Sequence, residues 1–165
     1  EGGAGIDATL RENARLNLID AAVKAGANEL RPETSDSPAA QRAVALYEKA
    51  LKFDPRNLDL NIGLGDARLI IARAATGPDQ AAWFARARDA YAEALNAGPT
   101  GPKLQAANAG LGRAARGLGQ LRESIGFYKA AGNDIRIASE LGEAQVEYAR
   151  SLPDGAEKQT AYKEG

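Results

Sequence analysis

Three glutamates near the C-terminal end are the clearest candidates for acid–base chemistry in this sequence. Glu140, Glu143 and Glu147 are spaced by three and four residues, which places them on neighbouring faces of one helix. Paired carboxylates act as acid and base where their surroundings drive their pKa values apart. Arg136 and Arg150 lie at helical spacing from these glutamates, so the pattern favours a solvated face of ion pairs over a catalytic pair.

A glycine-rich stretch, GLGRAARGLG at 110–119, has the composition of a phosphate-binding loop. Such a loop needs a preceding strand and backbone amides that point at the ligand from the start of a helix. Here the glycines fall inside an expected helix and at its end. We therefore interpret this stretch as close helix packing followed by a turn.

The overall composition excludes several classes of function. The chain contains neither histidine nor cysteine, which excludes zinc and haem ligation and His- or Cys-dependent catalysis by this chain alone. Its 21 basic and 22 acidic residues leave a net charge of −1, and without a basic stripe no nucleic acid is expected as a partner. No stretch approaches the roughly 20 apolar residues of a membrane span. We expect a non-enzymatic protein with no cofactor, metal or catalytic residues.

Alanine supplies much of the apolar character of this 165-residue chain, which is 44% hydrophobic but only 5% aromatic. Alanine has the highest helix propensity and allows helices to approach closely. The sequence has no run of alternating apolar residues, the pattern that would indicate a sheet. The periodicity and the Gly/Pro breakers predict one all-helical domain, 1–165, with helices over about 8–26, 38–53, 58–75, 79–96, 103–117, 120–131 and 134–151 and a short final helix. Gly26 is expected to end the first helix. Residues 27–38 are expected to form an exposed loop, with Ser37 capping the next helix.

A recurring pattern connects these helices. Leu-Gly pairs occur in alternate helices, at 64–65, 111–112 and 141–142, and the segments AVALYEKALKFDP (43–55) and ARDAYAEALNAGP (87–99) repeat Ala, Tyr, Ala and Pro at identical spacings. A third copy has Ser124, Tyr128 and Ala131 without the proline. The pattern resembles the tetratricopeptide repeat family, whose repeat of roughly 34 residues carries Leu-Gly in helix A and an alanine and an aromatic residue in helix B.

The resemblance implies an all-α solenoid of antiparallel helix pairs in a right-handed superhelix. About three and a half repeats would cover nearly the whole chain, although the Leu-Gly pairs are irregularly spaced. The glycine of each helix A would lie where helix B comes close, and the tyrosine of helix B would fill the remaining space.

The resemblance further implies a scaffold that binds a peptide or partner helix in a concave groove lined by helices A. Relative to the Leu-Gly pairs, the groove positions are Asp59, Ile62, Asp66, Leu69, Ala106, Ala109, Arg113, Arg116, Arg136, Ser139 and Glu143. Their mixed charge predicts a partner with both basic and acidic groups, flanking an apolar residue that meets Ile62 and Leu69. Chaperone adaptors of the family carry Lys and Asn where Ile62 and Asp66 stand here, which disfavours that role.

Two other functions remain open: a self-association module that forms a homodimer and, with less support, a small-molecule-binding or enzymatic helical domain. The Ala-, Arg- and Gly-rich composition is typical of a bacterial protein, and the chain is loosely similar to TadD-type repeat lipoproteins of secretion and pilus assembly. That similarity implies a periplasmic location, with a lipid anchor upstream of Glu1, while a cytoplasmic location stays open. Because the chain begins at Glu1 and contains no methionine, we expect a processed or trimmed piece.

Overall fold

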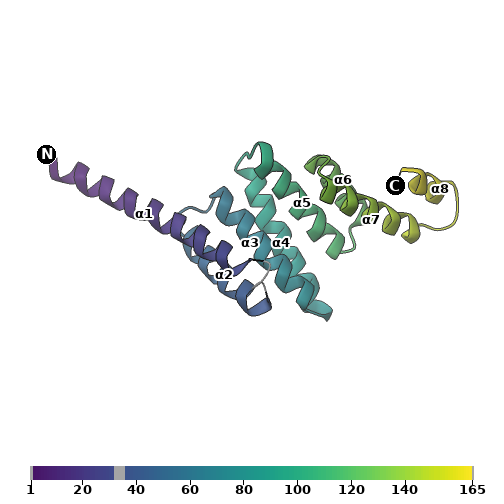
Figure 1. Cartoon of the computed structure of the whole chain (residues 1–165), viewed down its shortest axis with the longest axis horizontal. Helices are drawn as coiled ribbons and strands as arrows, with labels where there is room; N and C mark the ends of the chain where they lie inside the picture. Colours follow the sequence, from purple (N-terminus) through teal and green to yellow (C-terminus); the bar gives the residue numbers. More distant parts are fainter. Residues whose placement is uncertain (1, 32–35, 165) are drawn as a thin grey trace.

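The computed structural model describes residues 2–31 and 36–164, and all regular secondary structure in these two ranges is helical. Figure 1 shows the helices following one another from one end of the molecule to the other, with the two termini at opposite ends. In chain order they are α1 (Gly2–Glu29), α2 (Ser37–Leu51), α3 (Leu58–Ala74), α4 (Gly77–Asn96), α5 (Gly101–Gly117), α6 (Leu121–Ala131), α7 (Ile135–Ser151) and α8 (Ala156–Glu164).

The helices are stacked in chain order. Each helix packs on the next one, and α3 also contacts both α1 and α5 directly, so that these odd-numbered helices form an inner layer. The helices therefore form successive pairs, α1/α2 to α7/α8, of which the last ends in a helix of only 9 residues. This arrangement confirms the prediction of an all-α helical-repeat solenoid. Within the described residues, no helix has the length and apolarity needed to cross a bilayer.

The ends of α1 and α2 differ from the prediction. Gly26 does not end the first helix, because α1 continues to Glu29 and Leu30 N still donates to Gly26 O at 3.2 Å. The cap of α2 is Asp36 rather than Ser37: its carboxylate accepts from Ala39 N at 2.7 Å, as N-cap side chains do. The expected loop 27–38 is therefore shorter than predicted at both ends, and its residues 32–35 lie outside the described residues.

Two tyrosines of the repeated pattern, Tyr47 and Tyr91, are each held between glycines of two successive odd-numbered helices. Tyr91 of α4 is fully buried. A Cβ at Gly65 of α3 would lie 2.6 Å from its ring, and one at Gly110 of α5 would overlap the ring as well. Tyr47 of α2 is enclosed in the same way by Gly26 and Gly63. The predicted close approach at the Leu-Gly pair is thus confirmed for Gly65, and the group that approaches is the tyrosine ring.

The glycine pattern changes at α7. Tyr128 of α6 packs against Gly112 of α5, where a Cβ would lie 2.7 Å from the ring. On the α7 side, Glu140 occupies the position that corresponds to Gly63 and Gly110, two residues before the Leu-Gly glycine. For Gly142 itself, apart from neighbouring atoms of its own helix, no described atom lies within 4 Å of the position that a Cβ would take. The contacts that join the last helix pair to the pair before it therefore differ from the tyrosine–glycine contacts between the earlier pairs.

Three apolar clusters form the core, one at each junction of an odd helix, the following even helix and the next odd helix. Three of the buried polar side chains, Asn61, Asn108 and Ser124, are bonded to backbone carbonyls. Asn61 Nδ2 donates to Pro55 O at 3.0 Å, and the fully buried Ser124 donates from Oγ to Gly112 O at 2.9 Å. Such bonds avoid the cost of burying an unsatisfied polar group.

Candidate partner-binding surface

Three adjoining hollows run along the inner, odd-numbered helices. The first, of about 370 Å³, is lined by Leu30, Asp66, Leu69, Ile70, Arg73, Arg113, Arg136 and Glu140. Arg113 also borders the second and third hollows, which extend along α5 and α7 in two directions. Because all three hollows share this arginine, we describe them together as the inner groove.

The inner groove contains eight of the eleven residues predicted to line it: Asp66, Leu69, Ala106, Ala109, Arg113, Arg116, Arg136 and Glu143. The other three lie elsewhere. Asp59 pairs with Lys103 of α5 at 2.7 Å, Ile62 packs against the second apolar cluster, and Ser139 is exposed on α7 without lining any of the three hollows.

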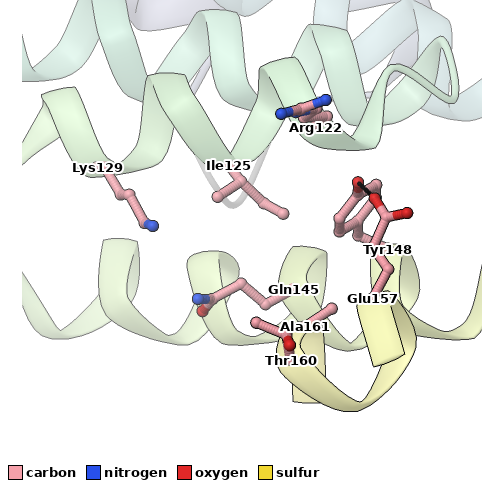
Figure 2. Close-up of a pocket in the computed structure, with 8 residues that line it drawn as sticks. All are labelled: Arg122, Ile125, Lys129, Gln145, Tyr148, Glu157, Thr160 and Ala161. Carbon is pink, nitrogen blue, oxygen red and sulfur yellow. Dashed lines mark hydrogen bonds between the residues drawn. The ribbon is translucent and has the colours of Figure 1, made fainter. Parts of the chain in front are cut away.

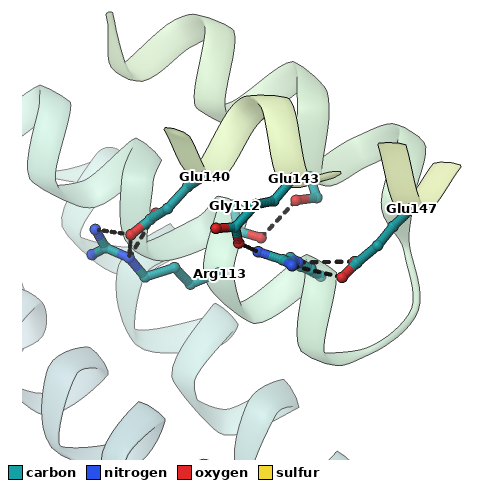
Figure 3. A network of polar contacts seen from close by, with 7 residues as sticks. Gly112, Arg113, Glu140, Glu143 and Glu147 are labelled. Atoms are coloured by element: carbon teal, nitrogen blue, oxygen red, sulfur yellow. Dashed lines mark hydrogen bonds and ion pairs between the residues drawn. The ribbon is translucent and has the colours of Figure 1, made fainter. Parts of the chain in front are cut away.

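The three glutamates of α7 are bound by two arginines of α5. Figure 3 shows this network, in which Arg113 donates from Nε to Glu140 at 2.9 and 3.0 Å. Arg116 contacts Glu143 at 2.7 Å and Glu147 at 2.6 Å. The prediction of an ion-pair face holds, but its partners come from a neighbouring helix rather than from Arg136 and Arg150 of α7.

One of these contacts lowers the pKa of a carboxylate, which is the direction that disfavours a role as general acid. The hydrogen bond from Arg116 lowers the pKa of Glu147. Burial, followed by the charge of Glu140, raises the pKa of Tyr128 to about 12. Glu147 therefore stays ionised at neutral pH, and the ion pairs join α5 to α7. Among the described residues, no three side chains of the metal-ligating types come together as a metal site.

Asp66 is bonded to the buried tyrosine of its own helix pair. The Tyr91 hydroxyl donates to Asp66 Oδ1 at 2.6 Å, and burial raises the pKa of Tyr91 well above its ordinary value, so the hydroxyl remains a donor. Burial of the carboxyl also raises the pKa of Asp66, while the bond from Tyr91 and the charges of Arg113 and Arg73 oppose that rise. Asp66 as a whole residue keeps accessible surface, so we regard the desolvation of its carboxyl as partial.

Arg73 is a cation of the groove that the sequence did not lead us to predict, and the apolar lining residues Leu30 and Ile70 were not predicted either. Arg73 follows Asp66 by seven residues and Leu69 by four, so the same helical register could have identified it. It is exposed in the groove, where its charge acts on Asp66. Arg136 is similar: its side chain is 87% exposed and its carboxylate contact, to Asp134, is 3.8 Å long. The cations of the groove therefore divide into two bonded to α7 glutamates and two that face solvent.

A separate hollow of about 360 Å³ lies between α6, α7 and α8, away from the predicted residues. Figure 2 shows Arg122, Ile125 and Lys129 of α6 across from α7 and α8, where Tyr148 donates to Glu157 at 3.3 Å. At the corresponding place in the second helix pair, Arg68 of α3 connects α2 and α4, because it donates to Glu48 at 2.9 Å and to Arg86 O at 2.8 Å. No repeated motif marks this hollow in the sequence, because it results from how α8 packs on α7.

No family model matches the chain, and no curated protein matches its sequence. The class of protein that the fold defines is an α-solenoid of helix pairs with a charged inner groove. The resemblance to tetratricopeptide repeats stays a prediction that rests on the residues quoted above.

Proposed function

We propose that this chain is a non-enzymatic scaffold of the tetratricopeptide type that binds a peptide segment or helix of a partner protein in the inner groove. The observation that supports this function most is the composition of the first hollow. Leu30 and Ile70 supply partly exposed apolar surface, the buried Leu69 also lines the hollow, and Arg73 and Arg136 stand beside it as exposed cations. An apolar surface flanked by available cations suits a segment that carries both apolar and acidic side chains.

The charges of the groove refine the partner expected from the sequence. Arg113 and Arg116 are neutralised by α7, and Asp66 accepts from Tyr91. In the first hollow Arg113 is paired with Glu140, and the two exposed arginines, Arg73 and Arg136, outnumber the carboxylate of Asp66. The net charge of this hollow is therefore positive, so we propose a segment with carboxylates on both sides of an apolar residue rather than one of alternating sign. Arginine suits this role, since its planar guanidinium binds carboxylates in a bidentate manner. The loose TadD-type resemblance makes components of a bacterial secretion or pilus-assembly system the first partners to test.

A peptide array with a matched pair of double variants tests the proposal. Each array member carries an apolar residue flanked by acidic residues, and its counterpart carries basic residues at the same positions. We expect the acidic series to bind, and the double variant Arg73→Glu/Arg136→Glu to lose that binding.

The control is Arg56→Glu/Arg122→Glu, which makes the same charge change at exposed positions outside the groove and should bind like the wild type. Preference for the basic series would contradict the proposed partner. Loss of binding in the control alone would move the site to the hollow between α6 and α8.

A further inference from the structure

One side of α1 is open, although the corresponding side of each following inner helix is covered. On α3, Gly63 packs against Tyr47 of the preceding α2, and on α5, Gly110 packs against Tyr91 of the preceding α4. The corresponding residue of α1, two before Gly26, is Lys24, which is exposed and paired with Asp20 at 2.7 Å. In the described part of the chain, no helix packs on this side of α1.

The open side of α1 carries an apolar stripe. Leu10, Ala14, Leu18, Ala21 and Ala25 follow one another by four, four, three and four residues, which places them along one face of the helix. Leu10 is 62% exposed and Leu18 is 37% exposed. Figure 1 shows the N-terminal part of α1 projecting beyond α2, so the part of the stripe that begins at Leu10 lies clear of the other helices.

We propose that this stripe binds the α1 helix of a second copy of the chain, in antiparallel orientation. The stripe is complementary to itself when reversed. With Leu18 near the two-fold axis, Leu10 faces Ala25 of the second copy and Ala14 faces Ala21, so that large side chains meet small ones. A parallel pair would set leucine against leucine and alanine against alanine, which fills the interface unevenly.

The polar residues beside the stripe agree with the antiparallel orientation. Asn13, Asn17, Asp20 and Lys24 lie on one flank of the stripe. In an antiparallel pair related by a two-fold axis, this flank faces the same flank of the second helix. Asn13 then approaches Lys24 and Asn17 approaches Asp20, each an amide beside a charge, and no like charges meet across this flank.

The size of the contact predicts a weak dimer. Residues 7–28 of the two helices would overlap over about 33 Å, in a strip about 10 Å wide. The area of this strip on each helix, which is the product of its length and width, is well below the roughly 800 Å² per partner of a standard stable interface. Association should therefore depend on protein concentration, with the monomer dominant in dilute solution.

Sedimentation velocity over a wide concentration range tests the dimer. For the wild type we expect the mass to rise from 17.3 kDa towards twice that value. Leu18→Glu places two carboxylates at the two-fold axis and should raise the concentration for half-dimerisation by roughly tenfold or more. The matched control is Leu16→Glu, the same change at a 50% exposed leucine of α1 that lies away from the stripe; it should dimerise like the wild type. A wild type that stays monomeric, or a dimer that Leu18→Glu leaves intact, overturns the proposal.

Disulfide trapping tests the orientation and gives a result even if Leu18→Glu fails to fold. The chain has no cysteine, so introduced cysteines have no competitors. We expect Leu18→Cys to cross-link to itself under mild oxidation, and Ala14→Cys to cross-link to Ala21→Cys in a mixture of the two variants. Cross-linking of Ala14→Cys to itself, or no cross-link at any of these positions, overturns the antiparallel pair, because a disulfide needs Cα atoms within roughly 7 Å.

Discussion

The hydroxyl of Tyr91 in α4 donates to the Oδ1 atom of Asp66 in α3 at 2.6 Å, from a side chain that is itself fully buried. This bond links the packing of a helix pair to a carboxylate that lines the inner groove. The same hydrogen bond therefore contributes both to the packing of the helix pair and to the surface that the pair presents in the inner groove.

The variant Tyr91→Phe tests that contact through its dependence on pH. It removes the hydrogen bond that lowers the pKa of Asp66, so that pKa, already raised by burial, rises further. A carboxyl whose pKa is higher in the folded than in the unfolded state stabilises the fold at pH values below its unfolded pKa. That stabilisation is lost as the pH rises through its folded pKa. We expect the free energy of unfolding to fall by about 1 kcal/mol at about pH 7, a figure that already allows for the accessible surface of Asp66. The loss should be smaller at about pH 3, where Asp66 is protonated in both states.

Urea unfolding at the two pH values measures this difference. Tyr148→Phe is the control, because its hydroxyl donates to Glu157 at 3.3 Å on the exposed side of α7, and it should change stability little at either pH. A cost of Tyr91→Phe that is equal at the two pH values would mean that Asp66 does not depend on this bond.

Two glycine-to-alanine variants separate close packing from helix propensity. Gly110→Ala places a Cβ into the ring of Tyr91 and should destabilise the chain by about 1–3 kcal/mol, as overpacking does. Gly126→Ala lies inside α6, with no described atom within 4 Å of the new Cβ, and should stabilise it by about 0.5–1 kcal/mol, because alanine favours helix. Thermal unfolding of both variants gives the comparison. Effects of the same sign would show that the tyrosine does not require its glycine neighbour.

The ion pairs between α5 and α7 should weaken in acid. Arg116 lowers the pKa of Glu147 in the folded state. The stabilisation from this pair is therefore present at pH values above the unfolded pKa of Glu147 and is lost as the pH falls through its folded pKa. Both side chains are partly exposed, so we expect Glu147→Gln to cost only about 0.5–1 kcal/mol at about pH 7. The variant should also lose less stability than the wild type between about pH 5 and about pH 3. Glu93→Gln, at an exposed position of α4, is the matched control and should follow the wild-type profile.

The parts of this fold that were predictable depend on local chemistry. Pro55 and Pro99 interrupt the helical hydrogen-bond pattern wherever they occur, and the Ala-x-x-x-Tyr spacing has one packing explanation. Gly26 was misread because a glycine that ends a helix and a glycine that admits a neighbouring ring look the same in sequence. Only the position of Tyr47 distinguishes them, and that position depends on tertiary packing.

The groove was predictable as a set of positions but not as a pattern of charges. Helical register placed Asp66, Leu69 and Arg113 together, since it fixes which residues share a face. The partner of Arg113 depends on how α7 is rotated against α5, and local sequence does not specify this rotation. Glu140 is within reach of Arg113 because of that rotation, which is why ion pairs within α7 were expected instead.

The tyrosines held between two glycines also determine how the molecule comes apart. Tyr47 and Tyr91 each belong to two junctions at once, so separating one helix pair exposes an aromatic ring that the next pair needs for its own packing. In a linear array, such sharing couples nearest neighbours and makes their unfolding cooperative. Tyr128 meets a glutamate instead of a second glycine, so this coupling is weakest between α6 and α7. The chain should therefore lose α7 and α8 as one unit before α1 to α6 unfold together, and amide hydrogen exchange would resolve these two steps.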